Sequence, residues 1–571
     1  MNLAWPSVSI VMPTYQRRDV ARAAVRALGR LDYAGDIELI VVVDGSTDGT
    51  AMAIQAIDLP FPMTVIEQDN AGASAARNRG AEFARNDILL FLDDDMVADP
   101  DLLTEHARLH RDGADAVIGE TPVHPDSPGG FLPESVARWI NSTRVRSPLS
   151  PFDIFTGQLS VKRSVFEALG GFDPALTRDG AFGNEDADFG VKLLADHDVR
   201  HNPAALSRQL YVVTPRQYMD RARFAAAADD HFMRKHPQLA RELLARKGYD
   251  RPLARFIYRP LAQVPGFAAL LSRMAVAVAD AALKTPFRSS RLVAKFYSGA
   301  RAIRYWSALR AKGWLPVSDS VLVLCYHAIE DQSDDPVLAP YGVAPDLFRK
   351  QLDSLTKRGF TFVSPDQFTF FLQGDALLPS RPVLLTFDDG YADLPETART
   401  ILRPRKIDAL AFAVTGPSTN EWDQPYGAKT KDLVTAGQRR ELTGLGVEIG
   451  SHSRTHREMP LLAGEELATE AAGSLEDLRA GGLNPRFFAY PYGALNASSK
   501  KAVADAGYCA AFGTAHRRVR RSDDRFDLPR VMIHATDRGW RFRTKTAAPR
   551  IWGSIERIRR TFSAAARRMT P

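Results

Sequence analysis

Two groups of side chains in this 571-residue sequence could carry out chemistry, and the first is the acidic triplet Asp93-Asp94-Asp95. It directly follows the apolar run at 88–92. Carboxylates at the end of a strand can converge on one hard cation, and Mg²⁺ or Mn²⁺ prefers such oxygen ligands, often together with substrate phosphates. A cation held there would neutralise a leaving diphosphate, so the triplet indicates group transfer. A solvated turn is the alternative.

The second group combines the pair Asp388-Asp389, which follows the apolar run at 382–387, with His452 and His456. Two histidines four residues apart can face one side of a helical turn and bind one metal. One carboxylate and two imidazoles leave a coordination position open for water, as in catalytic rather than structural zinc sites. Because the other carboxylate can take a proton from that water, the group indicates metal-assisted hydrolysis.

Both groups fall at the ends of predicted strands. Strand-like runs at 7–12, 38–43 and 87–92 alternate with helical patterns such as 19–30, which predicts a mostly parallel α/β sheet. Ligands bind at the carboxyl ends of strands in such sheets. The pattern fades after about residue 248, where a basic segment with several prolines is predicted to be helical, and a second α/β series begins at 321–326.

The composition is that of a globular protein, with 45% hydrophobic and 25% charged residues, which excludes a wholly disordered or fibrous chain. Two cysteines cannot build a disulfide framework, and Cys325 is expected to be a buried, inert thiol. We find no signal-peptide pattern at the N-terminus. The most apolar stretch, 264–283, contains Arg273 and Asp280, so we predict a cytoplasmic protein without a membrane span.

Positive charge is concentrated in two segments. Residues 241–312 hold 15 Lys/Arg and 3 Asp/Glu, and residues 538–571 hold 10 Lys/Arg and 1 Glu. Such segments suit an anionic membrane surface, and no nucleic-acid-binding motif accompanies them. The stretch 291–311 places Leu292, Phe296, Ile303 and Trp306 near one helical face, which predicts an interfacial helix at the inner face of the membrane. A linker helix packed on one domain is the alternative.

Residues 1–240 resemble the family-two glycosyltransferases in the order and spacing of several motifs. These are 8–17, Asp44-Gly45-Ser46, Asn70-Ala71-Gly72 with 76–80, Asp93-Asp94-Asp95, Thr156-Gly157 and Gly183-Asn184-Glu185-Asp186. The resemblance implies inverting transfer from a nucleotide sugar with Asp186 as general base. It also implies that Asp93 and Asp95 bind Mg²⁺ or Mn²⁺ and the diphosphate, and that Thr14, Asp44, Arg77 and Glu185 line the substrate site. No Gln-x-x-Arg-Trp motif is present, which favours one or a few sugar additions.

Residues 320–535 resemble the polysaccharide deacetylases of carbohydrate esterase family four. The matching motifs are 323–327, 386–390, 452–456, 488–493 and 528–534. The resemblance implies that Asp388 is the base and that Asp389, His452 and His456 hold Zn²⁺ or another divalent metal. Tyr490, Pro491 and Tyr492 would wall a groove for N-acetylated sugars. His534 is a candidate general acid, with a structural histidine as the alternative, and Ala489 stands where many members carry arginine.

Together these observations predict an α/β protein of two enzyme domains. We expect a Rossmann-like GT-A domain at 1–250, a basic helical linker at 251–318, a distorted (β/α) barrel at 319–546 and a basic tail at 547–571. The expected function is bifunctional glycan or glycolipid synthesis, with a nucleotide-sugar donor, a glycan or lipid-linked acceptor, peripheral contact with an anionic membrane and no nucleic acid. The alternative is one catalytic domain joined to a glycan-binding targeting module.

Overall fold

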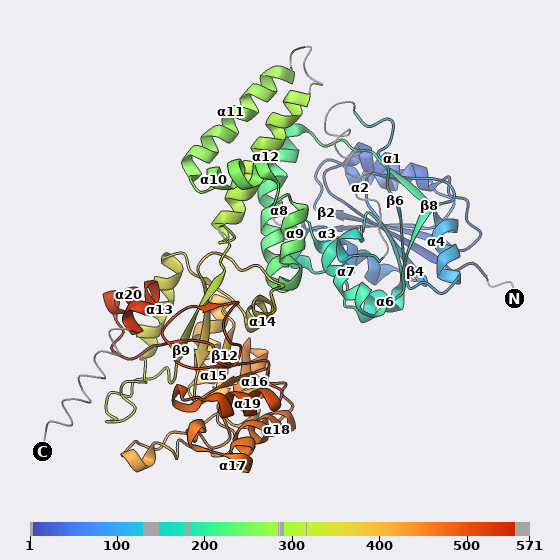
Figure 1. Ribbon diagram of the computed structural model, residues 1–571. Helices are drawn as coiled ribbons and strands as arrows, with labels where there is room; N and C mark the ends of the chain where they lie inside the picture. The colour runs from blue at the N-terminus through green and yellow to red at the C-terminus, as the bar shows by residue number, and fades with distance from the viewer. Residues whose placement is uncertain are drawn as a thin grey trace, which may run out of the picture. The chain divides into compact units, whose positions relative to one another are not determined.

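The computed structural model describes residues 4–128, 148–178, 183–283, 285, 291–315 and 317–553. Most of the predicted basic tail at 547–571 therefore lies outside the described residues. The chain divides into two compact units, 1–235 with 245–312, and 236–244 with 313–571. Each unit contains its own sheet and core (Figure 1). The helices of the expected linker belong to the first unit as far as residue 312.

The first unit is built on an eight-stranded sheet of order β3-β2-β1-β4-β7-β6-β8-β5. Its parallel part comprises β1 (Val8–Thr14), β2 (Ile37–Asp44), β3 (Met63–Gln68) and β4 (Ile88–Leu92). β7 (Gln158–Lys162) runs antiparallel to β4, and β6 (Ala116–Glu120), β8 (Val199–Gln209) and β5 (Met96–Ala98) complete the sheet. β1 and β4 are buried throughout, which explains their continuous apolar sequences. The strands predicted at 7–12, 38–43 and 87–92 are confirmed.

Helices accompany this sheet, as expected for an α/β fold. They are α1 (Arg18–Leu28), α2 (Thr50–Gln55), α3 (Ala73–Phe83), α4 (Leu102–Arg111), α6 (Arg163–Ala168) and α7 (Glu185–Asp196). A further helical group follows, with α8 (Pro215–Lys235), α10 (Arg259–Ala262), α11 (Pro265–Leu283) and α12 (Arg291–Ala311). Most of α9 (Ala240–Arg246) belongs to the stretch 236–244 of the second unit. Within this group α12 packs against both α8 and α11.

Protein covers part of the predicted apolar face of α12, on which Phe296 is partly buried, and the side chain of Leu292 lies outside the described residues. Ile303 and Trp306 are buried, and the Trp306 ring packs edge-on against Tyr249. The prediction that these two side chains face a membrane is therefore wrong, and the alternative of a helix packed on one domain is confirmed for α12. The periodicity revealed an apolar face but not which surface covers it.

The second unit has a curled nine-stranded sheet. Its parallel core has the order β15-β14-β13-β12-β11-β9. The strands are β9 (Ser320–Tyr326), β11 (Pro382–Phe387), β12 (Ala409–Ala413), β13 (Val447–Ser451), β14 (Phe487–Ala489) and β15 (Ala510–Phe512). The short strands β10 (Thr361–Phe362), β16 (Val519–Arg520) and β17 (Val531–Met532) pair with β11 or β9.

In the described part of this unit, eight α-helices lie between or after the strands. They are α13 (Pro345–Lys357), α14 (Pro365–Gln373), α15 (Leu394–Thr397), α16 (Ala436–Gly444), α17 (Gly464–Ala468), α18 (Ser474–Ala480), α19 (Ala497–Asp505) and α20 (Gly539–Ala547). Apolar clusters fill the space on both faces of the sheet. The α/β fold class predicted for both parts of the chain is confirmed.

Candidate active sites

In the first unit the predicted site residues lie at the carboxyl edge of the parallel strands. Thr14 and Asp44 are the last residues of β1 and β2, and Asp93 directly follows β4. Because neighbouring parallel strands end at the same edge of a sheet, these side chains come together although they are far apart in the sequence.

Arg17 ties the acidic triplet to the end of β1. Its guanidinium donates to Asp94 at 2.6 Å and to Asp95 at 3.0 Å, while the Thr14 hydroxyl donates to Asp94 at 2.7 Å. Both oxygens of the middle carboxylate, Asp94, therefore already accept hydrogen bonds from protein side chains. The Oδ1 atom of Asp95, in contrast, is buried and has no hydrogen-bond partner in the described part of the chain. An orphaned buried carboxylate oxygen suits a cation that is otherwise held by diphosphate oxygens and water.

A buried arginine bridges the two acidic motifs. Arg77 on α3 donates to Asp93 at 2.6 Å and to Glu185 at 3.3 Å, and only 4% of Arg77 is exposed. Next to Glu185, Asp186 accepts a hydrogen bond from the Thr156 hydroxyl. The carbonyl of Gly157 in turn accepts from the Asp93 amide at 3.1 Å. The triplet and the Glu-Asp pair thus lie together, as the resemblance implied, although about 90 residues separate them in the sequence.

Asp44 organises the loop that follows β3. Only 3% of this residue is exposed, and its carboxylate accepts from Gln68 at 2.8 Å and from the amides of Ala71 and Gly72 at 2.8 and 2.9 Å. Gly72 has a φ of +91°, and a Cβ there would lie 2.2 Å from the Thr177 carbonyl oxygen, so only glycine fits. Direct contact of Asp44 with a nucleotide stays a prediction.

The start of α7 is held from the helical group of the same unit. Asn184, with a φ of 66°, directly precedes the Glu-Asp pair and donates to Asp229 on α8 at 2.6 Å. Asp229 is buried and also accepts from the Tyr305 hydroxyl on α12 at 2.5 Å. This network fixes the backbone that carries Asp186. Sequence reasoning missed Asp229 and Tyr305, because no local motif marks either residue.

The pKa of the Asp186 carboxyl is raised to about 7. Burial is the largest cause, the Glu185 charge adds to it, and Arg77 opposes both. The pKa of Asp94 is likewise raised to about 7, by burial and despite Arg17. A carboxyl with a pKa near neutrality is suited to accept a proton at neutral pH.

Sugar transfer is therefore expected to lose about tenfold in kcat/KM per pH unit as the pH falls below about 7. The reason is that a base must be ionised, and Asp186 is ionised only above its pKa. A kcat/KM profile across pH measures this, and the Asp94→Asn variant is the matched control because it removes the other carboxyl with a similar pKa. A profile that stays flat down to about pH 5, as for an ordinary aspartate, contradicts the prediction.

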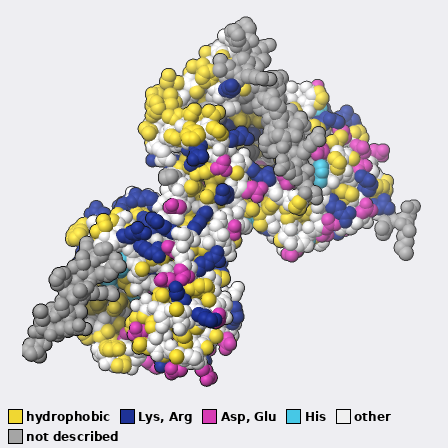
Figure 2. All heavy atoms as spheres, in the orientation of Figure 1, with side chains coloured by type: hydrophobic (Ala, Val, Ile, Leu, Met, Phe, Trp, Pro, Cys, Tyr) yellow, Lys and Arg dark blue, Asp and Glu magenta, His cyan; other side chains and the backbone are white. Residues whose placement is uncertain are grey.

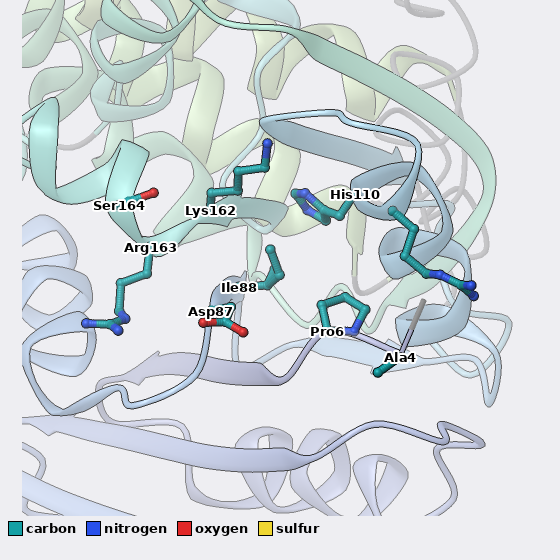
Figure 3. A pocket seen from close by; sticks show the side chains of 9 residues that line it. Ala4, Pro6, Asp87, Ile88, His110, Lys162, Arg163 and Ser164 are labelled. Atoms are coloured by element: carbon teal, nitrogen blue, oxygen red, sulfur yellow. The ribbon is translucent and has the colours of Figure 1, made fainter. Parts of the chain in front are cut away.

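Among the described residues, one pocket lies at the carboxyl edge of this sheet and another at the opposite edge. The first pocket, of about 370 Å³, is lined among others by Arg17, Arg18, Asp48, Gln217 and Arg221. The other, of about 400 Å³, lies at the amino ends of β1 and β4 (Figure 3). There Lys162 pairs with Asp115 at 2.8 Å and Arg163 with Glu167 at 3.2 Å, so these cations are already engaged.

In the second unit Asp389, His452 and His456 form a compact buried group. Oδ1 of Asp389 lies 3.3 Å from Nε2 of both histidines. Nδ1 of His452 donates to the Ala489 carbonyl at 2.8 Å, which leaves Nε2 as an acceptor facing the carboxylate. A cation between these three atoms would satisfy the carboxylate oxygen and both ring nitrogens at once. The residues therefore fit a divalent metal with two imidazoles and one carboxylate.

The backbone around this group is held in unusual conformations. Asp389, Ser453, His456 and Tyr492 have φ values between 60° and 68°. Of the eight non-glycine residues with positive φ among those described, four are thus at this site, and Gln16 and Asn184 adjoin the site in the first unit. Such conformations persist where surrounding contacts enforce them, and they concentrate at functional sites.

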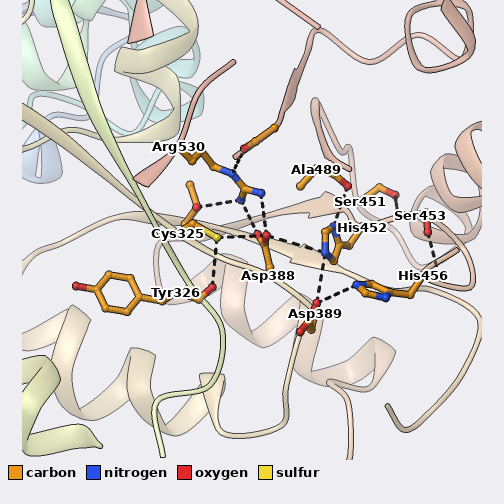
Figure 4. A network of polar contacts seen from close by, with 12 residues as sticks. Cys325, Tyr326, Asp388, Asp389, Ser451, His452, Ser453, His456, Ala489 and Arg530 are labelled. Atoms are coloured by element: carbon orange, nitrogen blue, oxygen red, sulfur yellow. Dashed lines mark hydrogen bonds and ion pairs between the residues drawn. The ribbon is translucent and has the colours of Figure 1, made fainter. Parts of the chain in front are cut away.

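Asp388 is clamped by a buried arginine (Figure 4). Arg530 donates to both of its oxygens, at 2.5 and 2.8 Å, and also contacts Thr386 and the Gly513 carbonyl. The Cys325 thiol donates to the same carboxylate at 3.3 Å. Burial alone would raise the pKa of Asp388, but the Arg530 and His452 charges hold it below its ordinary value. Cys325 is buried, as predicted, but it contacts the expected base.

The arginine beside Asp388 is thus Arg530, while position 489 is occupied by alanine. Its guanidinium lies between the Phe412 and Phe512 rings, 5.2 and 5.6 Å from their centroids. The Leu-Pro-Arg motif contains this residue, but the local sequence did not show which carboxylate it contacts.

Replacing Arg530 by Lys is expected to lower the deacetylation rate by about 10- to 100-fold, because lysine cannot hold Asp388 through two parallel hydrogen bonds. The bound metal content should stay unchanged, since Arg530 makes no hydrogen bond to Asp389, His452 or His456 in the described structure. Acetate release, metal analysis and thermal unfolding of the same preparation measure these quantities. A variant with the wild-type rate would show that the clamp does not position the base.

Of the three residues predicted to wall the sugar groove, only Tyr492 presents its side chain at the surface. It is 56% exposed and packs edge-on against His456, whereas Tyr490 and Pro491 are buried. Trp422, which sequence reasoning missed, stacks on His456 with ring centroids 4.3 Å apart. The structure therefore offers Tyr492 and Trp422 as aromatic walls beside the metal group. Substrate contact by Tyr490 and Pro491 stays a prediction.

His534 is partly buried beside a row of aromatic rings. Its ring lies 5.9 Å from that of Tyr341, which in turn lies 4.9 Å from His327. Its backbone amide donates to the buried Asp537 at 2.9 Å. The role of general acid stays a prediction for this residue.

Sheet order and site geometry define two α/β domains, each with one candidate catalytic centre at the carboxyl edge of its strands. Comparison with known proteins matches each of the two domains to a family. Residues 9–170 match the model of glycosyl transferase family 2, and residues 377–511 match that of polysaccharide deacetylase. The chain therefore carries a family-two glycosyltransferase domain and a polysaccharide deacetylase domain, as both resemblances predicted.

Individual relatives cover one domain each. Over 272 residues the chain is 28% identical to validoxylamine A glucosyltransferase of Streptomyces hygroscopicus subsp. jinggangensis (strain 5008), covering 42% of this chain and 63% of that protein, less than two thirds of its length. It is 22% identical over 235 residues to poly-beta-1,6-N-acetyl-D-glucosamine N-deacetylase of Staphylococcus aureus (strain MSSA476), covering 38% and 79%. The solved structure of IcaB from Ammonifex degensii aligns with a TM-score of 0.35 and 26% identity, covering 41% and 98%.

Proposed function

We propose that the chain is a bifunctional enzyme of glycan or glycolipid synthesis, which transfers a sugar from a nucleotide sugar and removes an acetyl group from an N-acetylated amino sugar. The observation that carries the proposal is the pairing of a buried metal-ligand group, Asp389 with two histidines, with a clamped neighbouring carboxylate, Asp388. In the other domain, the unpartnered Asp95 oxygen offers a ligand for a cation, and Asp186 offers a base with a raised pKa.

For deacetylation, a divalent metal such as Zn²⁺ at Asp389, His452 and His456 supplies charge that polarises the acyl oxygen and acidifies water. Asp388 accepts a proton from the attacking water, and Arg530 keeps the carboxylate oriented. The water oxygen bonds to the acyl carbon, the amide C–N bond breaks, and the leaving nitrogen takes a proton, for which His534 is the candidate donor. The products are acetate and the free amino sugar. The S. aureus relative named above acts on poly-N-acetylglucosamine, which supports N-acetylglucosamine as the sugar to test first.

For transfer, Asp186 accepts the proton of the acceptor hydroxyl as the new glycosidic bond forms and the bond to the diphosphate breaks. Mg²⁺ or Mn²⁺ at the Asp93-Asp95 end of the site supplies charge that stabilises the leaving diphosphate. Arg77 keeps Asp93 and Glu185 beside the base. Attack from the face opposite the diphosphate gives inversion, and the anomeric configuration of the product tests this step.

Removing the metal is expected to abolish acetate release from N-acetylglucosamine oligomers, and adding Zn²⁺ is expected to restore it. The same treatment should lower the unfolding temperature of the deacetylase domain, because three buried ligands lose the cation between them. Acetate is measured enzymatically, and hydrolysis of a panel of nucleotide sugars is measured in parallel. Full deacetylation in protein shown by metal analysis to be metal-free would refute the proposed mechanism.

A further inference from the structure

An exposed apolar stripe runs along the segment 253–278 of the first unit. Of the 16 large hydrophobic residues that are exposed in the described structure, eight lie here. They are Leu253, Phe256, Ile257, Val264, Phe267, Leu270, Met274 and Val278, each between 45% and 70% exposed. Figure 2 shows hydrophobic side chains gathered over α10 and α11. The last four follow helical spacing and form one face of α11, and Val264 directly precedes that helix.

The inward face of α11 carries the small residues. Ala268, Ser272 and Ala279 are buried, while Phe267 and Met274 point outward with half of their surface exposed. Small side chains allow α11 to approach α12 closely, and Tyr297 on α12 donates to Asp280 at 2.5 Å. A helix that faces water normally has the opposite arrangement, with large apolar side chains inside. The sequence of α11 is therefore suited to an apolar environment on its outer face.

The charges around the stripe are almost all positive. Residues 251–312 contain 12 Lys/Arg and one acidic residue, Asp280. Arg251, Arg255 and Arg273 are exposed beside the stripe and have no acidic partner within the described ranges. A second copy of this surface would bring like charges together, which opposes self-association. Apolar side chains flanked by unpaired cations are complementary to a surface with an apolar interior and anionic headgroups.

We propose that α11, with the preceding segment from Leu253, docks on the surface of an anionic lipid bilayer. The stretch Pro265–Ala282 has a mean hydropathy of 1.2, enough by length and composition to cross a membrane, and 17% of it is buried. It packs side-on against α12, which packs against α8, so the stripe meets the bilayer as a helix lying in the interface. This surface differs from the α12 face suggested by the sequence, and it does not depend on either catalytic activity.

Vesicle sedimentation of the full chain tests the proposal. We expect binding to phosphatidylcholine vesicles with 30% phosphatidylglycerol, weaker binding without phosphatidylglycerol, and loss of at least about tenfold in affinity for Phe267→Glu/Met274→Glu. The matched control is Met52→Glu/Phe83→Glu, which places the same charges on exposed apolar positions of α2 and α3. An unaffected α11 variant, or equal loss in the control, overturns the proposal.

A second measurement locates the contact without weakening it. In Val278→Trp, we expect fluorescence quenching by brominated lipids in excess of that in the wild-type protein, because the new side chain lies in the acyl region. Sedimentation without excess quenching places the contact elsewhere and overturns the proposal. Light scattering without lipid measures the oligomeric state and so tests the alternative that a second copy of the chain binds the stripe. A dimer that Phe267→Glu/Met274→Glu dissociates would show that a second copy covers the stripe, which also overturns the proposal.

Discussion

Replacing Asp388 by Asn is expected to lower acetate release by roughly a thousandfold while sugar transfer is unchanged. The amide cannot accept a proton from the attacking water, yet its size is close to that of the carboxylate, and one oxygen still accepts from Arg530. The metal group should remain intact, because Asp389 and the two histidines are separate side chains. The measurement is acetate release from N-acetylglucosamine oligomers, with metal content and thermal unfolding recorded on the same sample.

The matched control for this change is Asp408→Asn. Asp408 lies just before β12, at the amino end of that strand, while the candidate site is at the carboxyl ends. The same chemical change there should leave acetate release within about twofold of wild type, as for surface positions away from a site. Wild-type acetate release in Asp388→Asn would remove this residue from the mechanism. Loss of both activities in folded protein would contradict two independent sites.

The second large effect is expected for Asp186→Asn, which should reduce sugar transfer by roughly a thousandfold and leave acetate release unchanged. Asparagine retains an oxygen that can accept from the Thr156 hydroxyl, so the local structure should persist. It cannot take the proton of an acceptor hydroxyl. Nucleoside diphosphate release from the donor measures the reaction, and calorimetric titration with the nucleoside diphosphate checks that donor binding survives.

Asp196→Asn is the control on the same helix. Asp196 is the exposed last residue of α7, ten positions after Asp186 at the first turn. Its replacement should not alter transfer, since it makes no contact with the acidic cluster in the described structure. If Asp186→Asn transferred sugar at the wild-type rate, another group would have to be the base. If it lost donor binding as well, the residue would act in binding rather than in proton transfer.

The sequence located most of each site because the chemistry is encoded in short segments. Asp93-Asp94-Asp95, Glu185-Asp186, Asp388-Asp389 and the His452–His456 pair each span five residues or fewer. The expected helical turn is wrong for the histidines, because both lie in the loop that follows β13. Parallel strands then bring these segments to one edge of each sheet, as the strand predictions implied. The recognised motifs also contain Arg17, Thr156 and Arg530. The spacing of the motifs in the sequence did not show which carboxylate each of these side chains contacts.

By itself the sequence determined the two domain families, the α/β fold class and the carboxylates and histidines at the strand ends, because these depend on local periodicity and adjacent residues. Only the tertiary structure decided that Arg530 clamps Asp388, which is 142 residues away, and that Arg77 joins Asp93 to Glu185. It also decided that α12 buries part of its apolar face while α11 exposes one. Helical periodicity defines the width of an apolar face, but whether protein covers that face depends on packing between distant segments.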